Sequence, residues 1–274
     1  MIIDTHCHIH KSEMENAEKI IKESAENDIT IILNGTDSKS NEEVLELASK
    51  YENVYAALGY YYTIADKISD EDISLLDKKL NNDKVIAVGE IGLDYYNGKE
   101  NKDKQIELFE KMLNLAQKHD LPVIVHSRKA IQDTYDILKK HDAFGSMHSY
   151  QGSVEMAKEF IKLGFYIGIG GPITHSNNKK VKKMLKQIDI NHMLLETDSP
   201  YLSPEEKRGE PNTPLNIKYI ISKISEELDM DEDEIIRIST ANAQRLFGIW
   251  KVHKTKIQQK KPKYHKKLHK TKIL

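Results

Sequence analysis

The chain has 274 residues, 39% of them hydrophobic, and carries a formal net charge of -2. No apolar run approaches the length that spans a bilayer, and the opening lacks the basic and then apolar layout of a signal peptide, so we expect a cytoplasmic protein with no membrane contact and no obligate protein partner. The single cysteine, Cys7, excludes an intrachain disulfide and agrees with a reducing compartment.

The first expected element is a strand that carries two histidines. The chain opens MIIDTHCHIH, so His6 and His8 stand two residues apart. Side chains two apart lie on the same face of a strand, whereas on a helix they diverge by roughly 200°. A strand would therefore present two imidazoles to one cation such as Zn, Mn, Fe or Ni. The alternative from this motif alone is a chance cluster of histidines.

Short β-branched runs then alternate with longer amphipathic stretches along the chain. Helical patterns lie at residues 13–27, 41–51, 104–119 and 153–164. The expected strands are residues 1–7, 29–35, 54–60, 85–92, 122–127, 145–149, 165–171 and 192–198. Strand, helix and strand in this order predict parallel pairing through helical crossovers.

Eight such units predict an α/β fold of the (β/α)8 TIM-barrel type, regular or distorted, over residues 1–250. A doubly wound open sheet is the alternative architecture. Neither a GxGxxG motif nor a P-loop follows any expected strand, and this favours the barrel.

In such a barrel the active site lies at the carboxyl ends of the strands. Five of the eight expected strands end in side chains that can bind a metal: His6, His8, Glu90, His126, His148 and Asp198. Any one of the histidines could instead be a hydrogen-bonded core residue. Six such side chains at one level exceed the three protein ligands that a single catalytic ion commonly uses. The sequence therefore predicts a centre of two divalent metal ions.

Seven stretches of the chain resemble the TatD family of metal-dependent deoxyribonucleases, which are barrels of the amidohydrolase superfamily. They are DTHCH, GEIGLDYY, PVIVHSR, HSYQGS, ETDSPYL, RGEPNTP and STANAQRLFG, in this order within residues 1–248. The resemblance implies that one ion is held by His6, His8 and Asp198. It implies that His126 and His148 hold the second ion and that Glu90 bridges both. The ions could be Zn, Mg, Mn, Fe or Ni.

The resemblance also implies a hydrolase that cleaves DNA, as single strands or at 3′ ends. Two ions roughly 3.5–4 Å apart can activate water and offset charge on a phosphate. We take Asp198 as the candidate general base and Glu90 as a second catalytic residue. Hydrolysis of an amide, lactone or other ester at the same centre is the alternative, because fold and ligands do not fix the substrate. A weaker alternative is a nucleic-acid-binding scaffold that acts through a basic tail.

Three further side chains are candidates for substrate binding. Arg128 lies two residues beyond His126, where its guanidinium could grip a phosphate, although a surface salt bridge is equally compatible. Arg208, in the loop SPEEKRGEPNTP, is a weaker candidate, and Asn212 of that loop is expected to shape the mouth. Tyr62 belongs to the segment GYYYT, where relatives often carry histidine. Its ring could stack on a base or serve ordinary loop packing.

The last 24 residues, 251–274, differ from the rest in composition. They hold ten lysines and no acid, which leaves residues 1–250 with 31 basic and 43 acidic side chains. So few apolar residues cannot form a core, and we expect a mobile, lysine-rich arm after Trp250. On a nucleic-acid substrate, such an arm should add affinity through phosphate contacts.

Overall fold

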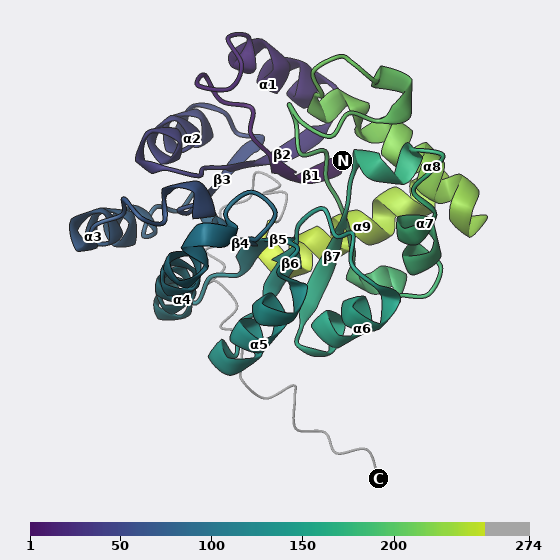
Figure 1. Ribbon diagram of the computed structural model, residues 1–274. Coiled ribbons are helices and arrows are strands. Elements are labelled where there is room, and N and C mark those ends of the chain that lie inside the picture. The colour runs from purple at the N-terminus through teal and green to yellow at the C-terminus, as the bar shows by residue number, and fades with distance from the viewer. Residues whose placement is uncertain (250–274) are drawn as a thin grey trace.

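The computed structural model describes residues 1–249, in which strands and helices alternate. The strands are β1 (Ile2–Cys7), β2 (Ile29–Asn34), β3 (Val54–Leu58), β4 (Val85–Asp94), β5 (Val123–Arg128), β6 (Gly145–Met147), β7 (Phe165–Ile169) and β8 (Met193–Leu195). The α-helices are α1 (Ala17–Glu26), α2 (Ser38–Lys50), α3 (Asp70–Lys79), α4 (Lys102–His119), α5 (Ile131–His141), α6 (Val154–Lys162), α7 (Lys179–Leu185), α8 (Ile217–Leu228) and α9 (Glu232–Phe247). Figure 1 shows the helices arranged around the strands.

The strands form one sheet in chain order, from β1 to β8, and every neighbouring pair is parallel. The register shifts within the β1–β2, β3–β4 and β4–β5 pairs. β6 and β8 are only three residues long. The predicted (β/α)8 barrel is therefore confirmed in a distorted form, and the open doubly wound sheet is not found.

Hydrogen bonds at the end of β8 bring it against β1. Thr5 Oγ1 donates to the carbonyl oxygen of Leu195 at 3.0 Å. The buried Asp4 carboxylate accepts from Thr197, through the backbone N–H at 2.9 Å and the hydroxyl at 2.5 Å. These contacts join β1 and β8 beside the predicted site, because His6 is two residues after Asp4 and Asp198 directly follows Thr197.

The strands are apolar on both faces, as a parallel sheet covered by helices requires. On β2, for example, Ile31 and Leu33 join the layer beneath the helices, while Ile32 points into the barrel. Residues on the inward face of the strands pack against α9: Ile3, Ile32, Ala57, Ala87, Ile124 and Leu194 against Ala243, Leu246 and Phe247. α9 therefore covers the end of the barrel opposite the predicted site, and Figure 1 shows it passing behind the strands.

Two helices begin three or more residues away from the first residue of the predicted pattern. α2 begins at Ser38 because Asp37 caps it, accepting from the backbone N–H of Ser40 at 2.7 Å. α1 begins at Ala17, since the preceding residues turn back on His10, whose carbonyl accepts from the N–H of Met14 at 2.9 Å. Within residues 1–249 no helix has the length and apolarity needed to cross a membrane. The predicted boundary after Trp250 and the lysine-rich arm lie outside the described residues.

Candidate metal centre

The six predicted ligands come together at the carboxyl ends of the strands. Their potential ligand atoms form three groups, each with its atoms within 4.8 Å of one another. The groups are His6 with His8 and Glu90, His6 with His148 and Asp198, and Glu90 with His126 and His148. The groups share members, so the six side chains make one continuous cluster.

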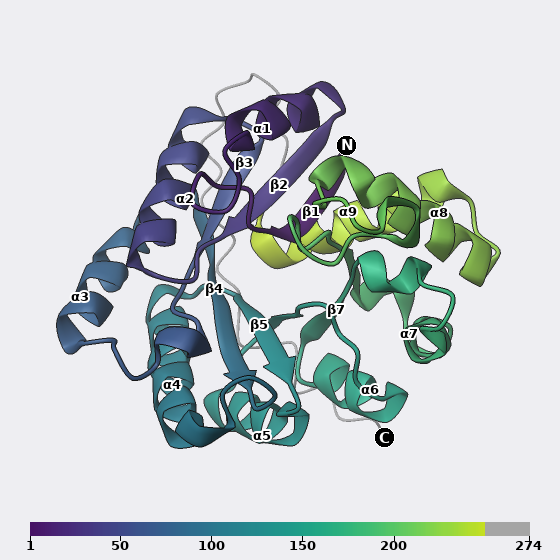
Figure 2. The ribbon, with the colours of Figure 1, turned by 45° about the horizontal axis from the view of Figure 1, so that its top comes forward.

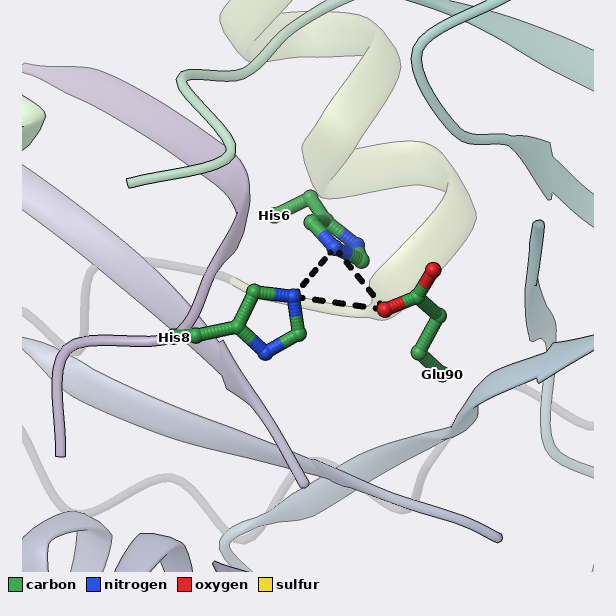
Figure 3. Close-up of side chains that lie close together, drawn as sticks. All are labelled: His6, His8 and Glu90. Carbon is green, nitrogen blue, oxygen red and sulfur yellow. Dashed lines mark hydrogen bonds and ion pairs between the residues drawn. The ribbon is translucent and has the colours of Figure 1, made fainter. Parts of the chain in front are cut away.

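β1 and the residue after it supply two imidazoles that face each other and Glu90, as Figure 3 shows. His6 Nε2 lies 3.0 Å from His8 Nε2. Glu90 Oε2 lies 3.6 Å from the first of these nitrogens and 3.3 Å from the second. The carbonyl oxygen of Asn34 accepts a hydrogen bond from His8 Nδ1 at 2.9 Å. This bond leaves the Nε2 lone pair of His8 directed into the cluster, as metal-binding histidines require.

Glu90 reaches the other half of the cluster through its second oxygen. Oε1 lies 3.2 Å from His126 Nδ1, so the two carboxylate oxygens face different histidines. His126 Nε2 donates to Asp94 Oδ2 at 3.1 Å. Asp94 is itself fixed, because the backbone N–H groups of Tyr96 and Asn97 each donate to its Oδ1 at 2.9 Å. Asp94 therefore sets the orientation of the His126 ring.

Asp198 and His148 complete the cluster. Asp198 Oδ1 lies 3.4 Å from His6 Nε2 and 3.5 Å from His148 Nε2. Behind His148, Glu196 Oε1 lies 3.1 Å from its Nδ1. Glu196 also accepts from the backbone N–H of Ser149 at 2.5 Å, which holds the carboxylate in place. Glu196 thus lies beside His148 Nδ1 as a charged neighbour, although this nitrogen has no hydrogen-bond partner within residues 1–249.

Glu196 needs space inside the barrel, and a glycine on β7 provides it. Glu196 is 1% exposed. A Cβ atom at Gly168 would clash with the Glu196 carboxylate. The absence of a side chain at Gly168 therefore lets Glu196 lie beside His148.

Burial opposes charge on all of these groups, but their mutual contacts override it. Burial lowers the pKa of His6 and of His8, yet hydrogen bonds to Asp198 and Glu90 raise them to about 9 and about 10. Burial would raise the pKa of Glu90, but hydrogen bonds from the surrounding histidines hold it well below its usual value. Burial would also raise the pKa of Asp198. The charge of His148 and hydrogen bonds from His6 and His8 instead hold this pKa below its usual value. The cluster therefore favours bound positive charge.

The donor set fits divalent cations. Two Nε2 lone pairs that face each other at 3.0 Å, as on His6 and His8, repel unless a proton or a cation lies near both. His6 Nδ1 is buried without a hydrogen-bond partner among residues 1–249. Imidazole nitrogens with carboxylate oxygens are typical ligands for Zn, Fe, Mn and Ni. The residues therefore could hold metal ions.

The arginine predicted to bind substrate lies beside this cluster. Arg128 is exposed at the end of β5, and its guanidinium carbon lies 4.0 Å from the ring centroid of Tyr96. No carboxylate forms a salt bridge with Arg128 in the part of the chain that the structure describes. Arg208 differs, since its 67% exposed side chain lies 3.4 Å from Glu205 and contacts none of the six predicted ligands within residues 1–249.

Tyr62 packs next to the cluster with little exposure to solvent. It is 7% exposed, and its hydroxyl accepts a hydrogen bond from Asn97 Nδ2 at 3.2 Å. Its ring stacks on His126 at 6.0 Å between centroids, while the neighbouring Tyr61 ring is closer, at 5.1 Å. The nearest aromatic side chain to His126 is therefore Tyr61, one residue before the predicted one.

Asn212 ties the loop after β8 to the end of that strand. It is fully buried, and its Nδ2 donates to the carbonyl oxygen of Thr197 at 2.8 Å. Its Oδ1 accepts from Asn216 Nδ2 at 3.0 Å. These bonds agree with the expected role of Asn212 in shaping the mouth.

Two residues of the site, Asp94 and Glu196, escaped the sequence reasoning. Both lie close in the sequence to a predicted ligand: Glu196 is two residues before Asp198, and Asp94 is four residues after Glu90 on the same strand. Even spacing relates Asp94 to Glu90 along β4, whereas Glu196 and Asp198 follow the end of β8, where the alternation of a strand does not apply.

Comparison with known proteins identifies the family to which this geometry belongs. The sequence model of the family described as TatD related DNase matches residues 3–248. The chain belongs to the TatD family. It is a metal-dependent hydrolase of that family, as the resemblance in its motifs implied.

This TatD-family chain is similar to curated proteins along nearly its whole length. It is 38% identical over 254 residues to the uncharacterized metal-dependent hydrolase YabD of Bacillus subtilis, with 91% of this chain and 100% of YabD covered. It is 34% identical over 253 residues to the uncharacterized metal-dependent hydrolase YjjV of Escherichia coli, covering 90% and 98%. The crystal structure of YjjV, a TatD homolog, matches with a TM-score of 0.85, 33% identity and coverage of 91% and 98%.

Proposed function

We propose that this TatD-family hydrolase is a deoxyribonuclease of the exonuclease type, which cleaves phosphodiester bonds in DNA with two divalent metal ions. The observation that carries the proposal is the position of Glu90. One of its oxygens faces His6 and His8, and the other faces His126. A carboxylate placed in this way suits two cations, and two cations suit an in-line displacement at phosphorus. The description of the matching family as related to DNases supports the same substrate class.

The bound ions would activate a water molecule and offset negative charge on the phosphate. The residues that would hold them are His6, His8 and Asp198 on one side, His126 and His148 on the other, and Glu90 between. We assign acceptance of the water's proton to Asp198. Its Oδ1 lies within 3.6 Å of three imidazole nitrogens, and its backbone N–H is fixed by a 2.9 Å bond to the His6 carbonyl. When the Asp198 carboxylate accepts the proton of the attacking water molecule, it acts as a general base.

A substrate panel on the purified, metal-loaded protein tests this function. The panel contains labelled single-stranded DNA, double-stranded DNA, RNA, methyl p-nitrophenyl phosphate, an N-acyl amino acid and a lactone. We expect cleavage of DNA and of the small phosphodiester, and loss of both activities on chelation. Asp198→Asn should abolish them, whereas Asp77→Asn, which removes a carboxylate from a surface ion pair on α3, should not.

Two results would contradict the proposal. Hydrolysis of the acyl amino acid or the lactone, with DNA left intact, would assign the centre to amide or ester chemistry. Full activity on DNA after chelation, with no bound metal, would exclude a metal-dependent reaction.

A further inference from the structure

Exposed large apolar side chains gather at the mouth of the barrel. In residues 1–249 there are four of them: Leu75, Tyr96, Tyr201 and Leu202. Leu75 belongs to α3, on the outside of the barrel, while the other three follow β4 or β8 and so lie where the metal centre lies. Tyr96 is 62% exposed and Tyr201 is 48% exposed. Two open aromatic rings beside a catalytic centre are a surface that a substrate can cover.

Tyr96 forms a charged stacking platform with Arg128. The guanidinium of Arg128 lies over the Tyr96 ring at 4.0 Å from its centroid, and this cation–π contact occupies one face of the ring. The backbone N–H of Tyr96 is bound to Asp94, which also holds the metal-ligand candidate His126. The platform is therefore anchored to one half of the centre and carries a positive charge without an acidic partner in the described part of the chain.

Tyr201 stands beside the other half of the centre. Its ring centroid lies 6.0 Å from that of His8, with an interplanar angle of 65°. The Tyr201 hydroxyl donates to Glu13 Oε2 at 2.5 Å, so the ring is held in one orientation by a residue of a different loop. A ring fixed in this way loses little conformational entropy when a flat ligand stacks on it.

The two rings lie on opposite sides of the barrel. Tyr96 and Arg128 belong to the ends of β4 and β5, whereas Tyr201 follows β8, which closes on β1. In a nearly closed barrel with the strand order β1 to β8, β4 and β5 lie across the barrel axis from β8 and β1, and Figure 2 shows β4 and β5 lying apart from β1. A chain that crosses the metal centre therefore meets one tyrosine before it and one after it.

We propose that Tyr96 and Tyr201 are base-stacking subsites, which hold the nucleobases on either side of the scissile phosphate of single-stranded DNA, with Arg128 contacting a neighbouring phosphate. This inference rests on the proposed deoxyribonuclease function. Unpaired bases offer free π faces to aromatic side chains, whereas the bases of a duplex are already stacked on one another. The two subsites therefore favour single strands and frayed ends over intact duplex.

Steady-state kinetics on short oligonucleotides test the subsites. The substrates are a single-stranded oligonucleotide and the same oligonucleotide with abasic positions in place of the bases. Tyr96→Ala and Tyr201→Ala should each raise KM for the intact oligonucleotide roughly 5- to 100-fold, the range expected for one base stacked on one aromatic ring. Tyr96→Phe and Tyr201→Phe keep the ring and should retain most of the affinity. Leu75→Ala, which removes an exposed apolar side chain from α3, is the matched control.

The abasic substrate separates stacking from other effects. The wild-type enzyme should bind it more weakly than the intact oligonucleotide, and the alanine variants should lose this preference. Metal content should not change in any of these variants, and the Leu75→Ala control should keep the wild-type turnover of methyl p-nitrophenyl phosphate. An unchanged KM for the intact oligonucleotide in both alanine variants would overturn the subsites while the nuclease function stands. A wild-type enzyme that cleaves neither DNA nor the small phosphodiester would overturn the proposed function, and this inference with it.

Discussion

Three histidines of the centre each have a neighbouring oxygen atom beside the ring nitrogen that points away from the cluster. For His8 the neighbour is a backbone carbonyl, that of Asn34, and for His126 it is the carboxylate of Asp94. For His148 it is Glu196. A carboxylate behind an imidazole raises its basicity and fixes its ring, and both effects strengthen metal binding. The centre is therefore larger than its six predicted ligands.

Glu90→Gln tests the bridging position. An amide keeps the shape of the Glu90 side chain but carries no negative charge toward either His6 and His8 or His126. The variant should therefore retain at most one ion per chain. Turnover of methyl p-nitrophenyl phosphate should fall at least roughly 100-fold. Elemental analysis and initial rates measure the two effects, with circular dichroism as the check of folding. Glu110→Gln, at a surface ion pair of α4, is the control. Two ions and near-normal turnover in the Glu90 variant would contradict the bridge.

Glu196→Gln tests the carboxylate that sequence reasoning missed. The variant keeps an acceptor for the Ser149 N–H but removes the charge beside His148, so metal affinity should fall about 10- to 100-fold. Titration with a competing chelator measures the affinity. Gly168→Ala, which forces the same carboxylate to move, should lower the affinity as well. If both variants bind metal like the wild type, Glu196 has no part in orienting His148.

The sequence was sufficient to predict that the six candidate ligands cluster, because each stands at or just after the end of an apolar strand, a pattern visible within each short segment. Asp94 ends β4 and Glu196 follows β8, but the role of each depends on which histidine of another segment it meets. The packing of strands into the barrel determines which side chains from different strands become neighbours. The spacing of residues within one segment does not contain this information. Arg208 shows the opposite case, since its loop is recognisable while its side chain pairs with Glu205 in solvent.

At the scale of elements, the loop between β4 and α4 depends on one buried side chain. Gln105 of α4 is fully buried and binds the loop at both ends. Its Oε1 accepts from the N–H of Asp94 at 2.9 Å, and its Nε2 donates to the carbonyl of Gly98 at 2.6 Å and to Asn101 Oδ1 at 2.8 Å. The loop carries Tyr96, so the position of the stacking platform depends on α4.

Gln105→Leu should destabilise this loop and the protein. The substitution leaves buried backbone groups of the loop without partners, which costs on the order of 2 kcal/mol of the free energy of unfolding. Chemical denaturation followed by circular dichroism measures the loss. Gln117→Leu places the same substitution at an exposed position of the same helix and should change stability little. Equal stability of the two variants would contradict the role of Gln105.

Element boundaries could be predicted only approximately. The apolar spacing of α2 begins at residue 41, yet the helix begins three residues earlier because Asp37 and Ser40 cap each other. Periodicity marks the residues that face the core, while a cap lies outside the periodic segment and adds a turn of polar residues. The strands were found more reliably, because burial on both faces makes each one a continuous apolar run.

For the molecule as a whole, the contacts that join β8 to β1 also bring Asp198 beside His6 and His8. Thr197→Val should therefore lower both stability and metal content. The variant removes the hydroxyl that donates to buried Asp4, at a cost of about 1–3 kcal/mol. Denaturation and elemental analysis measure the two quantities, and Thr30→Val on β2 is the control. A loss of stability with unchanged metal content would show that closure and the centre are independent.

The charge of the whole chain leads to a prediction about residues 251–274, which lie outside the described structure. Truncation after Trp250 removes ten lysines from a chain whose other residues are acidic overall. Single-stranded DNA should then bind more weakly at low salt, and each lost phosphate contact should reduce the slope of log affinity against log salt by roughly 0.7. Turnover of methyl p-nitrophenyl phosphate should not change. Identical salt slopes for the truncated and full chains would exclude a role in DNA capture.

The contacts between β1 and β8 also set when the protein can acquire its metal during synthesis. The bond between Asp4 and Thr197 joins residues 193 positions apart. At the usual rate of translation, roughly 10 to 40 s pass between the synthesis of these two residues. During that time the histidines of the first strand have left the ribosome, but Asp198 does not yet exist. The growing chain can therefore offer only part of a binding site, and full loading with metal must follow the completion of the last strand.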